Sequence, residues 1–405
     1  MTIPTFKELH IYLSSFANII GIFATLLLFY SWGSNQKFSE IGTFAILSSG
    51  YFLASQIATF GVDLSILSSK ELDLKGRIAI DNRFIFGFLA FIINAIIFFP
   101  LIYFDFLAPQ GINNRNIFIV WTASSIYVIN QVTMAFIQRV GLLNLNSIIY
   151  ASKHLGFLLG SIFILFTDQV IGLFFLSGEL VALMSSLVYF IKNFKKITYR
   201  SDNLFKIYEK SYFFSGFSQF TYSGLFKVDT FVLFFIADLR TLGVYSILSA
   251  VCEGLINFKT AFHPAIHNYF RKCMYSHEQV VTSSSVKKIY IISRYIGVSV
   301  LPAYIILHLV MFTSIPAKDM VLGATALALT LTFTNKLFLH YFFFSILGQP
   351  KRQLIFSISI IICNALLDIA LYYIMGLLGI ALATGLSYFI FHLILKLYTK
   401  EYLSG

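Results

Sequence analysis

Long apolar runs alternate with short polar or basic segments along almost the whole 405-residue chain. A helix needs roughly 20 predominantly apolar residues to cross the hydrocarbon core of a bilayer. Runs of that length recur from Ile11 almost to the C-terminus. We therefore predict about twelve membrane-spanning helices, at residues 10–32, 40–66, 84–106, 116–138, 143–166, 169–191, 211–236, 241–269, 289–312, 320–347, 353–375 and 377–398.

The composition also indicates that the chain lies in a lipid bilayer. Hydrophobic residues make up 58% of the chain and charged residues only 12%, about half the share that is typical of soluble domains. A chain of this composition cannot cover its surface with polar groups, so it is expected to be an all-α integral membrane protein. In lipid the helix satisfies every backbone hydrogen-bonding group within its own segment.

Basic residues in the short loops predict the orientation. If the N-terminus is cytoplasmic, most loop lysines and arginines fall on the cytoplasmic side, as the positive-inside rule requires. The opposite side then carries only Lys37, Arg115, Arg240 and Lys318. This bias also places the C-terminus in the cytoplasm, which requires an even number of spans. It explains the net charge of +11 without a nucleic-acid partner.

The longest cytoplasmic link, at 192–210, divides the predicted spans into two sets of six. We expect an N-terminal lobe at 1–200 and a C-terminal lobe at 201–405, arranged around a central cavity. Two halves that enter the membrane from the same side can be parallel repeats about an axis along the membrane normal. The predicted outer loops are all short, at about ten residues or fewer, which argues against a polymerase or glycosyltransferase with a large outer loop.

Five basic residues fall inside predicted spans, where lipid exposure costs roughly 2.5–3.5 kcal/mol each. They are Lys153, Lys227, Lys259, Arg294 and Lys336. At 1.5 Å per residue, the four lysines lie near the midplane. We therefore predict a cationic chamber for an anionic substrate. Arg294 is shallower and could instead reach the cytoplasmic surface.

Two histidines extend this pattern. His263 and His340 follow Lys259 and Lys336 by four residues, so each shares a helix face with a lysine. Such a face suits a phosphate or pyrophosphate, although each histidine alone is equally typical of a bundle core. We expect no metal site, because no carboxylate or thiol group converges on these histidines, and no cofactor.

Acidic residues also occur within the predicted spans: Asp63, Glu179, Asp229, Glu253 and Asp368. One interpretation is ion pairing with the lysines, which suits Asp229 and Glu253. The other is a protonatable site that couples transport to an ion gradient. Glu179 and Asp368 are the better candidates for coupling, because neither has a basic neighbour in the sequence.

The second half resembles the polysaccharide transporter family, the Wzx-type O-antigen flippases. Asp229 precedes an apolar run and a short turn, and Gly243 and Tyr245 follow at the start of the next span, which ends near Pro264. Further matches are the basic turn Gly348-Gln-Pro-Lys-Arg352, then Asn364, and then Gly376-Leu-Leu-Gly-Ile-Ala-Leu-Ala-Thr384. Thr230 departs from the family, which often has a basic residue after the Asp.

The resemblance implies the multidrug/oligosaccharidyl-lipid/polysaccharide exporter (MOP) fold and a flippase that is not an enzyme. Its substrate would be an undecaprenyl-pyrophosphate-linked oligosaccharide, carried across the bacterial inner membrane by alternating access. Membrane lipids are expected partners of a monomeric chain, with a polysaccharide polymerase and a chain-length regulator as candidates. The alternative is a drug or cation antiporter of the same fold, for which carboxylates should dominate the cavity. A flippase for lipid-linked peptidoglycan precursors usually has fourteen spans and is disfavoured.

Overall fold

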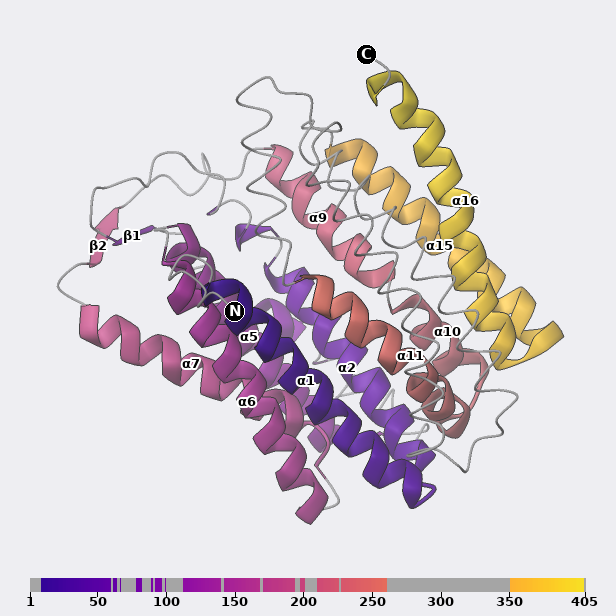
Figure 1. The fold of residues 1–405 in the computed structure, drawn as a ribbon, viewed down its shortest axis with the longest axis horizontal. Helices are drawn as coiled ribbons and strands as arrows, with labels where there is room; N and C mark the ends of the chain where they lie inside the picture. The colour runs from indigo at the N-terminus through magenta and orange to yellow at the C-terminus, as the bar shows by residue number, and fades with distance from the viewer. Residues whose placement is uncertain are drawn as a thin grey trace, which may run out of the picture. The chain divides into compact units, whose positions relative to one another are not determined.

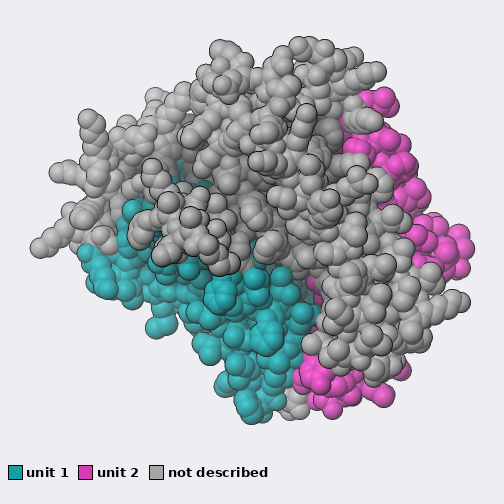
Figure 2. Space-filling view, viewed as in Figure 1, with its two compact units in different colours: residues 1–28, 43–223 teal, residues 29–42, 224–405 magenta. Residues whose placement is uncertain are grey.

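The computed structural model describes residues 9–59, 61–63, 66, 78–81, 89, 92–96, 99, 112–139, 142–167, 170–193, 197–200, 210–225, 227–260 and 350–403. The chain forms two compact units, coloured separately in Figure 2. Unit 1 comprises residues 1–28 and 43–223, and unit 2 comprises 29–42 and 224–405. The sequence placed a division at 200/201, whereas unit 1 continues to residue 223.

The first half of the chain folds into long helices that agree closely with the predicted spans. They are α1 (Leu9–Ser34), α2 (Phe38–Thr59), α5 (Asn114–Arg139), α6 (Leu143–Thr167) and α7 (Leu173–Asn193). Helix α9 (Lys210–Leu225) follows and covers only the first part of the seventh predicted span. Within unit 1, α7 packs against both α5 and α6 (Figure 1). The third predicted span, 84–106, lies largely outside the described residues.

A small parallel sheet supplements the helices of unit 1. Strand β1 (Ile78–Asp81) pairs with β2 (Ile197–Arg200), with Ile78 opposite Ile197. The strands belong to the links that follow the second and sixth predicted spans. The spans of the described chain remain all-helical, as the sequence predicted.

Small residues bring α6 and α7 into close contact. The Ser177 hydroxyl donates a hydrogen bond to the Gly156 carbonyl at 2.8 Å. A Cβ atom on Gly156 would lie 2.6 Å from the Ser177 carbonyl oxygen and 2.7 Å from the Gly178 Cα. Glycine at this position therefore sets how closely the two backbones approach, as is typical of helix contacts in membranes.

Unit 2 contains α10 (Val228–Ile236), α11 (Leu239–Thr260), α15 (Pro350–Met375) and α16 (Leu377–Leu403). Helix α15 packs against both α10 and α16. The turn between α15 and α16 is made at Gly376, whose φ of 62° is a left-handed conformation that glycine adopts without strain. The ninth and tenth predicted spans, 289–312 and 320–347, lie outside the described residues.

The seventh span was predicted as one helix at 211–236, and this prediction is wrong. Helix α9 ends at Leu225 and α10 begins at Val228. The Lys227 amide instead closes a short turn on the Gly224 carbonyl, at 2.9 Å. Glycine weakens a helix interior, and Lys227 takes the position that caps α10. The apolar run alone could not reveal this break, because both halves are hydrophobic.

Helix α11 begins with a side-chain cap. The Asp238 carboxylate accepts a hydrogen bond from the Thr241 amide at 2.6 Å. This bond lowers the pKa of Asp238, which lies in the turn between two predicted spans. The cap satisfies an amide that the helix leaves without a partner in its first turn.

Seven described helices are long and apolar enough to cross a membrane. Large apolar side chains such as Phe166 and Ile191 are 85% and 75% exposed, as expected where lipid is the solvent. The chain is a multi-pass membrane protein.

The close approach of α6 and α7 can be tested with Gly156→Ala. The added methyl group meets two backbone atoms that cannot rotate away, so we expect a loss of about 1–3 kcal/mol in unfolding free energy. Thermal unfolding of the protein in detergent measures this. The matched control is Gly50→Ala on α2, where a Cβ meets nothing within 4 Å. That change should be neutral or slightly stabilising, since alanine favours the helix. Equal melting temperatures for the two variants would contradict the packing argument.

Candidate functional site

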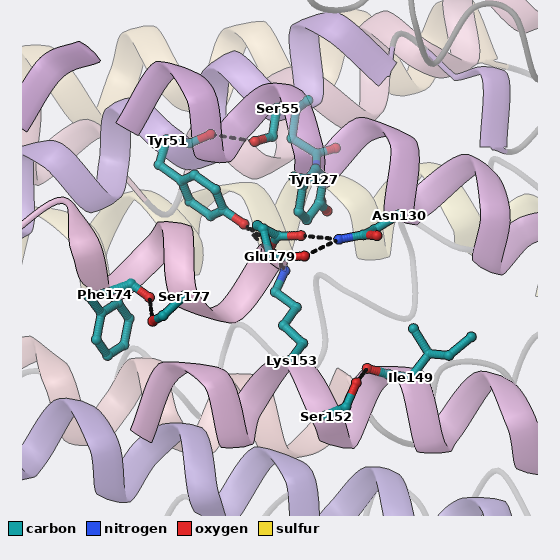
Figure 3. Close-up of polar contacts among 11 residues, drawn as sticks. Tyr51, Ser55, Tyr127, Asn130, Ile149, Ser152, Lys153, Phe174, Ser177 and Glu179 are labelled. Carbon is teal, nitrogen blue, oxygen red and sulfur yellow. Dashed lines mark hydrogen bonds and ion pairs between the residues drawn. The ribbon is translucent and has the colours of Figure 1, made fainter. Parts of the chain in front are cut away.

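Among the described residues, each unit holds a buried cluster of polar side chains centred on an acid. The cluster in unit 1 is centred on Glu179 of α7, which is fully buried (Figure 3). Its carboxylate accepts a hydrogen bond from the Tyr51 hydroxyl of α2 and another from the Asn130 amide of α5, the latter at 2.7 Å. Asn130 also donates to the Glu179 backbone carbonyl at 3.0 Å. The acid is thus held by donors from two other helices.

Lys153 of α6 completes this cluster. Its Nζ lies 2.6 Å from Glu179 Oε1, and its side chain is only 11% exposed. The same nitrogen donates to the Tyr51 hydroxyl at 3.3 Å. A buried pair needs such supporting hydrogen bonds to offset the loss of water around both charges. The net charge of the pair is zero.

Aromatic rings enclose the Lys153 ammonium on its other sides. Nζ lies 4.4 Å from the centre of the Tyr127 ring, 5.4 Å from Phe157 and 5.9 Å from Tyr51. These distances are within the range of cation–π attraction. A second layer supports the first, because Phe174 stacks on Phe157 at 4.8 Å and Phe175 stacks on Tyr51 at 4.9 Å.

The cluster in unit 2 is centred on Asp229 of α10. One carboxylate oxygen accepts from the Asn364 amide of α15 at 2.7 Å. The other accepts from the Thr384 hydroxyl of α16 at 2.7 Å and from the Tyr245 hydroxyl of α11. Four helices of unit 2 therefore meet at this single carboxylate.

A second acid, Asp368, joins this cluster. It is fully buried, and Asn364 donates to its Oδ2 at 3.3 Å while also binding Asp229. The Asp368 Oδ1 atom has no hydrogen-bond partner among the described residues. Ser387 fixes the bridging amide by donating to the Asn364 carbonyl oxygen at 2.8 Å. Two carboxyl groups thus share one amide donor.

This pair differs chemically from the first cluster. Two ionised carboxylates at such short range repel strongly in a medium of low dielectric constant. The arrangement is therefore least costly when one proton or one bound cation balances part of the charge. A proton shared between the two neighbouring carboxyl groups can supply that positive charge. The geometry suits an exchangeable proton or monovalent cation.

The structure brings several predicted site residues together. Lys153 and Glu179 form an ion pair, although neither has the other near it in the sequence. Asp229 and Asp368 share one cluster. Lys227 lies at the N-terminus of α10, and Asp63 follows α2, where it is half-buried. Lys259 and Glu253 lie on α11, but their side chains are outside the described residues, and so are Arg294, Lys336, His263 and His340.

The expected cationic chamber stays a prediction, because the side chains of Lys259 and Lys336 lie outside the described residues. At Lys153 the structure shows the ion-pairing interpretation, with Glu179 as the partner, because a buried lysine is least costly beside a carboxylate. Glu179 therefore has a basic partner in the structure, although no basic residue lies near it in the sequence.

Four contributors to the first cluster were missed from the sequence, namely Tyr51, Tyr127, Asn130 and Phe157. Asn130 gave a usable signal, as a fully polar amide in the middle of an apolar span. The tyrosines gave none, because tyrosine is common throughout this chain. In unit 2, Tyr245, Asn364 and Thr384 were noted only as parts of the family resemblance.

No family model matches the sequence, and no curated protein matches it. Solved structures do match over the whole chain. An inward-facing multidrug resistance MATE family transporter of the MOP superfamily is 13% identical, with a TM-score of 0.61, and the match covers 100% of this chain and 96% of that one. An outward-facing structure of a MATE transporter is also 13% identical, with a TM-score of 0.54, covering 100% and 99%.

A third match is a MOP superfamily transporter from Pyrococcus furiosus, described as having a binding pocket of reversed polarity that suggests a different function. It is 14% identical, with a TM-score of 0.56, covering 100% of this chain and 99% of that one. These likenesses show that the chain has the fold of the MOP superfamily transporters, which confirms the predicted fold class.

The ion pair in unit 1 can be tested by a double-mutant cycle. Lys153→Met leaves Glu179 as a buried acid without its cation, and Glu179→Gln leaves Lys153 without its anion. Each should cost about 3–5 kcal/mol of unfolding free energy. The double variant should lose less than the sum of the two, by about 0.5–3 kcal/mol. Thermal and denaturant unfolding in detergent measure all four proteins, and strictly additive losses would contradict direct pairing.

The bridging amide in unit 2 can be tested with Asn364→Ala. This change removes the donor to both carboxylates, so we expect a loss of about 1–3 kcal/mol. The control is Ser357→Ala on the same helix, where the buried hydroxyl donates only to the Gln353 carbonyl one turn earlier. Thermal unfolding should separate the two variants. If both lose the same small amount, the amide does not hold the carboxylates together.

Proposed function

We propose that this chain is an ion-coupled membrane transporter that exports an amphipathic organic substrate by alternating access, without covalent chemistry on the substrate. The single observation that carries the proposal is the pair of buried carboxyl groups of Asp229 and Asp368, which share the Asn364 amide inside a membrane helix bundle. Ionisable groups inside a membrane are expensive, so their presence marks ion or substrate pathways.

The two acids can take up and release one positive charge. A bound proton or cation relieves their repulsion, and its loss restores it, so the free energy of unit 2 depends on ion occupancy. An ion gradient across the membrane would then shift the transporter between its inward-facing and outward-facing states. The likeness to both an inward-facing and an outward-facing MATE transporter supports this cycle, because the fold accommodates both states.

We propose an organic cation as the substrate class, as in a drug or cation antiporter. The likeness to a multidrug resistance transporter supports the same class.

A second candidate is the flippase for lipid-linked oligosaccharides. One observation favours it. Asp229, Tyr245, Asn364 and Thr384 carry the resemblance to polysaccharide transporters in separate stretches of sequence, and these four side chains meet in one hydrogen-bonded cluster. Under this candidate the same acids would drive export of an anionic lipid carrier across the bacterial inner membrane, with both termini cytoplasmic.

The proposal is tested by expressing the chain in drug-sensitive bacteria loaded with the fluorescent cation ethidium. Energised cells should lose ethidium faster than cells with empty vector, and an uncoupler should abolish the difference. Asp229→Asn and Asp368→Asn should each remove at least about nine-tenths of this efflux, since each neutral amide cannot exchange the coupling charge. Ser357→Ala, which lies outside the cluster on α15, is the matched control.

The alternative substrate is followed in parallel. Deletion of the gene in its native host should leave surface polysaccharide unchanged if the antiporter proposal is right. Two results together would favour the flippase over the antiporter: expressing cells that keep as much ethidium as empty-vector cells, and a deletion host that loses its surface polysaccharide. Ethidium efflux at the native rate in both Asp→Asn variants would contradict the coupling role of Asp229 and Asp368.

A further inference from the structure

The surroundings of the Lys153 ammonium have the composition of a binding site for an organic cation. One carboxylate, Glu179, faces the nitrogen at 2.6 Å, and the rings of Tyr127 and Phe157 present their faces at 4.4 and 5.4 Å. Tyr51 adds its hydroxyl at 3.3 Å. An acid combined with aromatic faces is how proteins recognise alkylammonium and quaternary ammonium groups.

We propose that this aromatic–carboxylate cage, formed by Tyr51, Tyr127, Phe157 and Glu179, is a binding site for organic ammonium ions, and that Lys153 is its tethered resting occupant. An external cation binds by displacing the Lys153 ammonium from Glu179. The inference deepens the proposed function by naming the substrate group recognised in unit 1, and it rests on that function only for transport, not for binding.

The walls of the cage come from four helices and are held independently of Lys153. Glu179 keeps its hydrogen bonds from Tyr51 and Asn130 if the lysine withdraws (Figure 3). Phe157 and Tyr51 keep their stacking partners Phe174 and Phe175. The cage should therefore survive the loss of its occupant, with one uncompensated negative charge.

The wall formed by Tyr127 differs from the others. The Tyr51 and Phe157 side chains are buried, at 6% and 9% exposure, whereas Tyr127 is half-buried. Its ring is also the one nearest to the ammonium. An incoming cation that meets this ring first can keep an aromatic contact while it competes with Lys153 for the carboxylate.

Competition between Lys153 and an external cation for Glu179 has two physical consequences in a transporter. An empty anionic cage inside a membrane would carry the full cost of a buried unpaired acid. The tethered ammonium removes that cost between substrates. It also sets a threshold, because only a cation that gains more from the rings and the acid than Lys153 does can replace it. Lys153 is thus a specificity-determining residue rather than an open anion site.

The test is chemical rescue of Lys153→Ala, purified as the full chain in detergent. This variant lacks the lysine side chain beyond Cβ, which corresponds to n-propylammonium. We use n-propylammonium and tetramethylammonium chlorides as probes, with sodium chloride at equal ionic strength as the reference. Binding is measured as the rise in melting temperature and by calorimetric titration. Lys153→Ala should bind both probes at least about tenfold more tightly than the native chain, because the tethered competitor is gone.

The matched control is Lys153→Ala combined with Glu179→Gln, which keeps the vacated space and the rings but removes the charge. Its binding should fall by about tenfold or more from the single variant. If Lys153→Ala does not fold, Lys153→Gln removes the ammonium while its amide can still donate to Glu179. A neutral amide competes less strongly than an ammonium, so this variant should still bind both probes more tightly than the native chain, by a smaller factor than Lys153→Ala.

Three results would overturn the inference. Failure of the folded single variant to bind either probe would show that the cage does not accept external cations. Binding of n-propylammonium alone would show a cavity that is shaped for lysine and no other ligand. Equal binding by the single and double variants would show an apolar void without charge recognition. Because binding is measured without transport, each result is independent of the ethidium efflux that tests the proposed function.

Discussion

The cost of an unpaired charge inside a bilayer is the constraint on which this structure depends. Lys153 and Glu179 illustrate it, since each would be strongly destabilising alone and the two lie 2.6 Å apart across α6 and α7. Tyr51 and Asn130 then satisfy the remaining lone pairs of the acid from α2 and α5. One ion pair therefore dictates which faces of four helices turn towards one another.

The same constraint gives a different result in unit 2. There the acid Asp229 is surrounded by hydroxyl and amide donors, and Asp368 lies beside it and shares the Asn364 amide. The first cluster pairs an acid with a lysine, whereas the described partners of the second are two acids and neutral donors. This contrast is the basis of the two roles that we propose, an organic-cation site in unit 1 and a coupling-ion site in unit 2. All the contacts described for each cluster lie within a single unit.

Close helix packing supports both clusters. Glycine and serine on α6 and α7 let the backbones meet, which brings Lys153 within reach of Glu179. In unit 2 the left-handed Gly376 folds α16 back on α15, so that Thr384 and Asn364 reach the same carboxylate. The outer faces remain apolar, as the bilayer requires.

The sequence by itself determined the membrane class, most boundaries of the described helices and the identity of the unusual charges, because these follow from local hydrophobicity and from the energetic cost of charge in lipid. It named Lys153, Glu179, Asp229 and Asp368, but it placed Lys153 among cations and left Glu179 without a partner. Only the tertiary structure decided the partners, since Lys153 and Glu179 meet through helix packing across 26 residues of chain, and Asp229 and Thr384 across 155. It also decided the break at Lys227, because an apolar run records that a segment lies in the membrane but not whether its helix is continuous.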